Sequence, residues 1–147
     1  MAADAAFPRD ENFVPITNLG LKASKTITYS AATTGAVGVT TLFNVTGVVA
    51  MYLFGLCEVD LTGTGTIEVG VTGATATLAN QQSATAIDVH EVWHNSTLAV
   101  GGTVGNSVHI IDQNVIQTIG TNTVTGGRIT YYCYWVPISE DGNVTAA

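Results

Sequence analysis

The stretch "VVAMYLFGLCEVDL", residues 48–61, decides the fold of this chain. Its most apolar part, from Val48 to Cys57, is about ten residues long, well short of the roughly 20 that a helix needs to cross a bilayer. We interpret residues 48–61 as a long strand that is apolar on both faces for most of its length. Such a strand suits the centre of a β-sandwich, or a position between a core and a subunit interface.

The chain around this strand has a similar character from residue 25 onward. Short segments rich in Val, Ile, Thr and Tyr are separated by Gly or Asn at spacings of roughly 8 to 12 residues, which is typical of an antiparallel β-sandwich or barrel. No segment has a convincing helical period. We therefore predict an all-β protein with one β-sandwich domain over residues 25–147. The expected strands are 25–30, 38–46, 48–61, 65–72, 74–79, 84–92, 107–111, 114–124 and 127–138, with a tight hairpin at Gly126 and Gly127.

The last expected strand carries bulky side chains on both faces. Its residues Ile129, Tyr131, Cys133 and Trp135 alternate with Thr130, Tyr132, Tyr134 and Val136. Because Tyr is enriched at interfaces, one face is expected to fill the core and the other to meet a neighbouring subunit, although an ordinary central strand would read the same way. The candidate interface residues are Tyr132, Tyr134 and Trp135.

Residues 1–24 differ in composition from the rest of the chain. Pro8 and Pro15 drive the residues before them toward extended geometry. We therefore expect an extended N-terminal arm whose apolar side chains dock on another surface, with a frayed terminus as the alternative. The residues expected to make this contact are Phe7, Pro8, Arg9, Phe13, Pro15 and Ile16.

The composition bounds the class of protein. Apolar residues make up 46% of the 147 residues and charged residues only 10%, so we expect the chain to cover part of its surface with copies of itself or with a partner. The net charge is −7 and the four basic residues are scattered, which argues against nucleic-acid binding. No transmembrane helix and no apolar signal region is expected, so the chain is predicted to stay in the cytoplasm where it is made. Cys57 and Cys133 are expected to be reduced and buried, with a disulfide as the alternative.

Residues 90–94, "HEVWH", match the H-E-x-x-H pattern of zinc metallopeptidases. That chemistry needs a helix, on which residues four apart come within roughly 5 to 6 Å at Cβ, whereas a strand separates them by roughly 13 Å. The flanking residues are β-formers and small residues, and no third zinc ligand follows at the expected spacing. A peptidase acting through His90, Glu91 and His94 is therefore the least favoured function. We expect a strand end here, with Trp93 buried.

Other catalytic patterns are absent from the sequence. There is no G-x-S-x-G, G-x-x-x-x-G-K or C-x-x-C. Glu58 and Asp60 share one face of the long strand and could bind a cation, but solvated charges near a strand end are the simpler interpretation. We expect no enzyme activity, no metal and no cofactor.

Three segments resemble small virion proteins of tailed bacteriophages, of the head decoration or cement type. They are "TTLFNVTGVVAMYLFGLCEVDLTGTGTIEVG" (40–70), "IDVHEVWHNST" (87–97) and "RITYYCYWVPISEDGNVTAA" (128–147). The resemblance implies a jelly-roll-like sandwich that forms symmetric oligomers, namely homotrimers, on the outside of an icosahedral head. Its partner would be the major capsid protein, and the arm would contact that protein. The chain would be made in the host cytoplasm and end in the virion.

A second virion role stays open at this stage. A tail or host-recognition module would use loops such as residues 72–77 or 95–106 to bind a surface glycan. Threonine-rich sandwiches serve both roles, so the sequence does not separate them.

Overall fold

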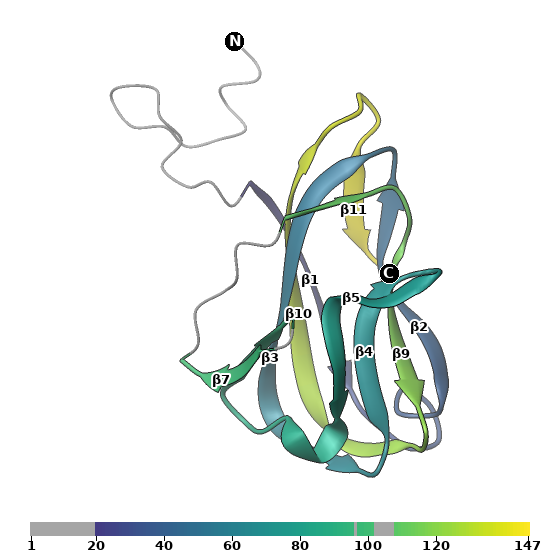
Figure 1. Ribbon diagram of the computed structural model, residues 1–147, viewed down its shortest axis with the longest axis vertical. Coiled ribbons are helices and arrows are strands. Elements are labelled where there is room, and N and C mark those ends of the chain that lie inside the picture. The colour runs from purple at the N-terminus through teal and green to yellow at the C-terminus, as the bar shows by residue number, and fades with distance from the viewer. Residues whose placement is uncertain (1–19, 96, 102–107) are drawn as a thin grey trace.

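The computed structural model describes residues 20–95, 97–101 and 108–147. These residues form two antiparallel sheets that pack face to face as a β-sandwich (Figure 1). The strands are β1 (Leu21–Thr28), β2 (Gly38–Thr46), β3 (Val49–Gly63), β4 (Thr66–Val71), β5 (Ala74–Ser83), β6 (Glu91–His94), β7 (Thr97–Val100), β8 (His109–Ile111), β9 (Val115–Gly120), β10 (Val124–Pro137) and β11 (Asn143–Ala146). A single 3-10 turn, η2 (Ala84–Ala86), interrupts them in the described part. The prediction of an all-β sandwich is confirmed.

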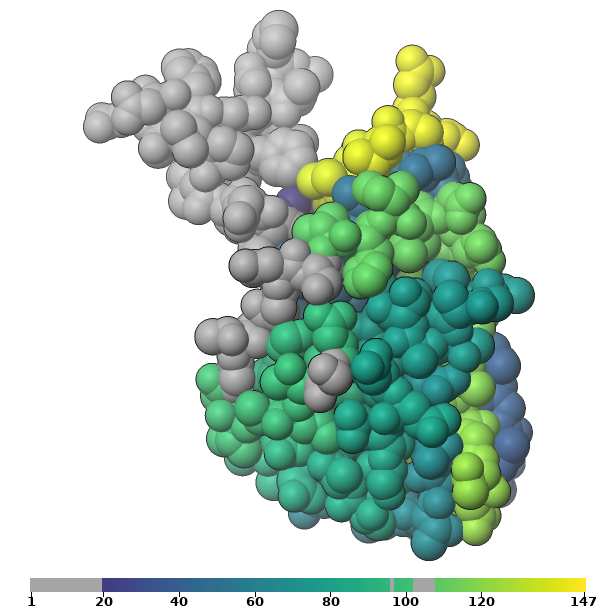
Figure 2. All heavy atoms as spheres, in the orientation of Figure 1, coloured from purple at the N-terminus to yellow at the C-terminus, as the bar shows by residue number. Residues whose placement is uncertain are grey.

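The chain alternates between the two sheets. The six-stranded sheet has the order β1-β10-β3-β6-β7, with β8 also paired to β3, and the five-stranded sheet has the order β11-β2-β9-β4-β5. The pairing is nested, since β1 pairs with β10, β2 with β9, β3 with β6 and β8, and β4 with β5. The chain therefore runs as a long double strand that turns back at the β4–β5 hairpin. The C-terminal strand β11 pairs with β2, and the C-terminal segment, in yellow, lies at one end of the molecule (Figure 2).

The long strand β3 lies in the middle of the six-stranded sheet, as the sequence of residues 48–61 predicts. Its side chains alternate between buried and part-exposed, with Val49, Met51 and Leu53 in the core between the sheets. The opposite sheet contributes Leu42 and Phe43, both fully buried. At roughly 1.5 to 3 kcal/mol for each large apolar side chain removed from water, this core supplies the main driving force for folding.

Three buried polar side chains join the two sheets across this core. The hydroxyl of Tyr29, just after β1, donates to Oε1 of Gln117 on β9 at 2.6 Å, and the hydroxyl of Tyr131 on β10 donates to the same oxygen at 2.9 Å. The two hydroxyl oxygens are 3.0 Å apart. Burial raises the pKa of both tyrosines, and their proximity raises that of Tyr29 further, so both stay neutral.

The structure corrects several expected boundaries. Leu21 to Ser24, which we assigned to the arm, belong to β1 and pair with β10. Gly126 and Gly127 form no hairpin but lie inside β10, where the register with β3 shifts. Gly127 has φ +106°, and a Cβ there would lie 2.5 Å from the Asp60 carbonyl oxygen. Glycine at position 127 therefore allows the β-bulge, in which the backbones of β10 and β3 approach closely. Strands β7 and β11 were not predicted.

Candidate interface on the six-stranded sheet

The H-E-x-x-H segment does not form a helix. His90 is exposed in a turn with φ +70°, while residues 91–94 form β6 and pair with β7. Glu91 accepts a hydrogen bond from the Asp88 amide at 2.9 Å, and Trp93 is buried in the core. The prediction that this segment is not helical and that Trp93 is buried is confirmed, but the expected strand over residues 84–92 is wrong, since residues 84–86 form η2 and the strand spans 91–94. Within residues 20–95, 97–101 and 108–147, no three His, Cys, Asp or Glu side chains gather closely enough to hold a metal ion.

Glu58 and Asp60 are both engaged by the protein. Glu58 accepts from Arg128 Nε at 2.6 Å and from the Thr130 hydroxyl at 3.0 Å, and Asp60 accepts from the Val89 amide at 2.5 Å. The two carboxylates therefore have separate partners, and the cation site that their spacing could have indicated is not assembled.

The two cysteines are free and buried, as predicted. Cys57 lies opposite Ile129 and Cys133 opposite Leu53, so the two thiols lie at different levels of the β3–β10 pair. Burial raises the pKa of Cys57 to about 11 and that of Cys133 to about 12. Both thiols are therefore protonated at neutral pH and poorly nucleophilic.

The outward side of the six-stranded sheet carries four stacked aromatic rings, which we call the aromatic face. Tyr52 and Phe54 of β3 lie opposite Tyr134 and Tyr132 of β10 in the strand register. The ring centroids are 5.4 Å apart for Tyr52 and Tyr134, 5.3 Å for Phe54 and Tyr132, and 6.1 Å for Phe54 and Tyr134, all stacked. Each ring remains partly open to solvent. The rings are ordered by one another before any partner arrives, which lowers the entropic cost of binding.

Apolar neighbours extend the aromatic face. Ala50 and Leu56 share its side of β3, and Val136 continues it on β10. Beside them, Ile110 of β8 is 65% exposed. The strands of the five-stranded sheet contain one aromatic residue, Phe43, which is fully buried. Among the described strands, an outward aromatic surface is therefore confined to the six-stranded sheet.

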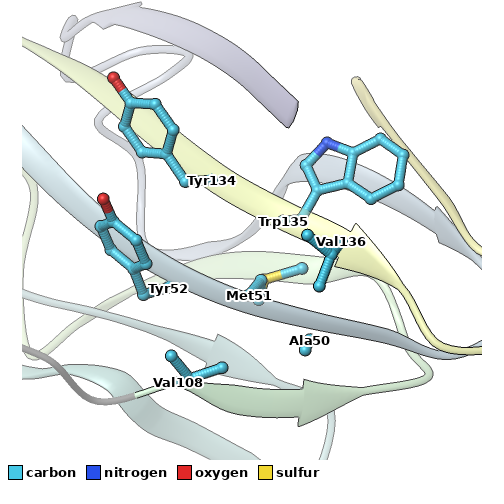
Figure 3. Close-up of a pocket in the computed structure, with 7 residues that line it drawn as sticks. All are labelled: Ala50, Met51, Tyr52, Val108, Tyr134, Trp135 and Val136. Carbon is cyan, nitrogen blue, oxygen red and sulfur yellow. The ribbon is translucent and has the colours of Figure 1, made fainter. Parts of the chain in front are cut away.

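A notch of about 90 Å³ opens at one end of the aromatic face, lined by Ala50, Met51, Tyr52, Val108, Tyr134, Trp135 and Val136 (Figure 3). Tyr52 and Tyr134 project side by side from neighbouring strands at its edge (Figure 3). Its lining is mostly apolar. A cavity of roughly 150 Å³ can hold benzene, so a notch of this size fits a branched aliphatic side chain.

The charges near the aromatic face are balanced or positive. Lys22 of β1 places its ammonium 5.9 Å from the centre of the Tyr132 ring, which is a cation–π distance. Glu58, the acid nearest the rings on β3, is paired with Arg128, and Asp60 follows two residues further along the strand. Partial burial, followed by the nearby Tyr134, raises the pKa of Tyr52, which keeps this phenol uncharged.

The structure separates the three interface candidates from the sequence. Tyr132 and Tyr134 belong to the aromatic face, but Trp135 is 7% exposed and belongs to the core. Successive residues of a strand point to opposite sides, so Trp135 cannot share the outward side with Tyr134. Tyr52 and Phe54 were missed, although the alternation of residues 50 to 56 in the long strand contains the signal.

The arm residues expected to bind a partner lie outside the described residues. They are Phe7, Pro8, Arg9, Phe13, Pro15 and Ile16. The described part of the chain contains no helix long and apolar enough to cross a membrane. Comparison with protein-family models, curated proteins and solved structures gives no significant match.

Proposed function

We propose that this chain is a structural subunit that covers a protein surface, and that it is a head decoration protein of a tailed bacteriophage. In this role it binds the major capsid protein on the outside of the virion as a symmetric oligomer, a homotrimer. The observation that carries the proposal is the aromatic face, an ordered apolar surface on one sheet only. Such surfaces mark protein-binding sites.

Covering this surface contributes favourably to a protein contact, but it does not by itself offset the full cost of association. If about 50 Å² of each of the four rings is still open to water, covering them contributes about 5 kcal/mol at about 25 cal/mol per Å². Neighbouring apolar residues such as Ile110 and Val136 add to this.

The strand connectivity supports the jelly-roll form that the resemblance implies. In a jelly roll, a long antiparallel hairpin is rolled so that its strands fall alternately into two sheets. The nested pairs β1·β10, β2·β9 and β4·β5, with β3 paired to β6 and β8, follow this plan.

The N-terminal arm has a defined part in the proposal. An extended segment can lie along a neighbour or add a strand to a sheet edge, with main-chain hydrogen bonds for affinity and apolar anchors such as Phe7 and Phe13. Deleting residues 1–19 removes the arm but leaves β1 complete, since that strand begins at Leu21. We expect the shortened protein to fold and to bind heads more weakly. Saturation of heads with unchanged affinity would refute a role for the arm.

The experiment that tests the function is a count of this protein in purified virus particles. Quantitative mass spectrometry against the major capsid protein should give hundreds of copies, or a ratio near one to one. A handful of copies would point instead to a tail or host-recognition module. Of the loops suggested for glycan binding, Thr72 and Gly73 form a tight turn and residues 74–77 belong to β5. Absence from the particle would refute a virion role.

A further inference from the structure

We infer that the occupant of the aromatic face is a second copy of this chain. This inference rests on the proposed function only in taking the aromatic face as a protein-binding surface. It assigns the face to contacts between copies and leaves the capsid to other parts of the molecule. Three observations support it: the charge of the face, its dimensions, and the exposure it would otherwise have in the free protein.

The charge of the aromatic face favours a copy of this acidic chain. The chain carries a net charge of −7, so two copies repel each other over most of their surfaces. At the aromatic face the Glu58 carboxylate is paired with Arg128, and Lys22 adds a positive charge above Tyr132. Asp60 lies on β3 two residues beyond Glu58, at the far end of the rings, and accepts a hydrogen bond from the Val89 amide. The other acids of the described residues lie at strand ends, in loops or on the other sheet: Glu68, Asp88, Glu91, Asp112, Glu140 and Asp141. An acidic molecule therefore meets less repulsion at this face than over the rest of the described surface.

The outward side of the six-stranded sheet, with the aromatic face at its centre, has the dimensions of a contact between folded proteins. Four adjacent strands at about 4.8 Å spacing and about eight residues at about 3.3 Å each span roughly 19 by 26 Å, or about 500 Å² in projection. Side-chain relief raises the accessible area above that value, toward the roughly 800 Å² per partner of a standard interface. The notch beside Tyr52 and Tyr134 provides a place where an apolar side chain of the neighbour can anchor.

A second copy is also the partner that is present whenever the chain is made. A protein with so few charged residues, 10% of the chain, has little charge to keep an exposed aromatic sheet face soluble. Coverage by another copy removes that surface from water before any larger assembly is encountered.

The test is the mass of the full-length protein in solution, without phage particles. Light scattering after size exclusion, and sedimentation at micromolar concentration, should give a whole-number multiple, above one, of 15.2 kDa. Tyr134→Glu places a charge among the stacked rings and should give a folded monomer. Thr41→Glu adds the same charge to the outward side of β2 in the other sheet, where Thr41 is also part-buried, and should leave the mass unchanged.

A second variant tests the notch without adding charge. Ala50 lines the notch and is part-exposed, so Ala50→Leu fills it while the four rings remain. We expect the dissociation constant between copies to rise at least tenfold, with the thermal unfolding midpoint of the monomer retained. Circular dichroism of each variant shows whether it is folded.

The outcomes separate this inference from the proposed function. A monomeric wild-type protein, or an oligomer that persists in folded Tyr134→Glu and Ala50→Leu variants, would overturn the inference. If such a protein still coated heads in hundreds of copies, the decoration role would stand and the aromatic face would belong to the capsid contact. An oligomer that the two variants dissociate supports the inference, even if the protein proved absent from virus particles.

Discussion

Gln117→Leu should lower the free energy of unfolding when Tyr29 and Tyr131 are present. The same replacement should raise it when both tyrosines have been replaced by phenylalanine. Tyr29 and Tyr131 have one hydroxyl hydrogen each, and both hydrogens are directed at Gln117 Oε1, at 2.6 and 2.9 Å between heavy atoms. With leucine at position 117, one hydroxyl can donate to the other, but the second hydrogen has no acceptor. One hydrogen bond is lost and a buried donor is left unpaired. Gln117→Leu also removes Nε2, which has no partner among the described residues. The net loss is about 1 to 2 kcal/mol.

The same replacement should stabilise a protein that already carries Tyr29→Phe and Tyr131→Phe. In that background the amide of Gln117 is fully buried and has lost both donors. An amide buried without partners costs about 1 to 3 kcal/mol in proteins, and Gln117→Leu removes that cost. We therefore expect the triple variant to be about 2 kcal/mol more stable than the double variant.

Urea unfolding at one fixed protein concentration measures these four free energies, because association would otherwise shift them. Tryptophan fluorescence is a suitable signal, since the buried Trp93 ring lies 6.3 Å from that of Tyr131. A change of the same sign in both backgrounds would refute the reasoning that the three groups act as one hydrogen-bonded unit.

Three further outcomes follow from the glycine and thiol environments. Gly127→Ala should lower the free energy of unfolding by at least about 3 kcal/mol, because residue 127 has a positive φ and the new Cβ would lie 2.5 Å from a carbonyl oxygen. Gly126→Ala is the control, since its Cβ meets only the Thr62 hydroxyl at 3.0 Å, and it should cost less than half as much in the same urea assay. Cys57 and Cys133 should resist a thiol reagent at pH 8 in the native protein and react at once in urea; rapid reaction of the native protein would contradict their burial. Because both folded-state thiol pKa values, about 11 and about 12, lie above the ordinary value of 9.0, the thiols stabilise the fold fully below pH 9, and stability should fall as the pH rises from 9 toward 12. An unfolding midpoint that stays constant or rises over that range would contradict this sign.

The fold class could be predicted from the sequence because the runs of β-forming residues, and the Gly and Asn residues that separate them, are local properties of the chain. The bounds of β2, residues 38–46, were predicted without error, and those of β3 within two residues, since both are runs of β-forming residues ended by glycine. The Gly126 and Gly127 pair was misread because a tight turn and a bulge share the same local requirement for positive φ. Only the partner strand distinguishes them, and the partner is set by tertiary structure.

For a similar reason, only two of the four residues of the aromatic face, Tyr132 and Tyr134, were predicted. Alternation in the last strand separated Tyr132 and Tyr134 from Tyr131 and Cys133, but it could not say which set meets the opposite sheet. Trp135 was chosen for its residue type and proved to be on the buried side. The stacking of Tyr132 on Phe54 depends on the register between β10 and β3, which are separated along the chain by six other strands.

The nested strand pairing has a consequence for how this protein is synthesised. Leu21 pairs with Trp135, so β1 leaves the ribosome long before the strand it must join. At about 5 to 20 residues per second, the roughly 110 residues between them take about 5 to 20 s to translate. Throughout that interval β3 also lacks its neighbour β10, and the rings of Tyr52 and Phe54 have nothing to stack on. The six-stranded sheet can therefore close only when synthesis is nearly complete. A message cut short before codon 124, where β10 begins, yields a product in which β1 and β3 both have open edges.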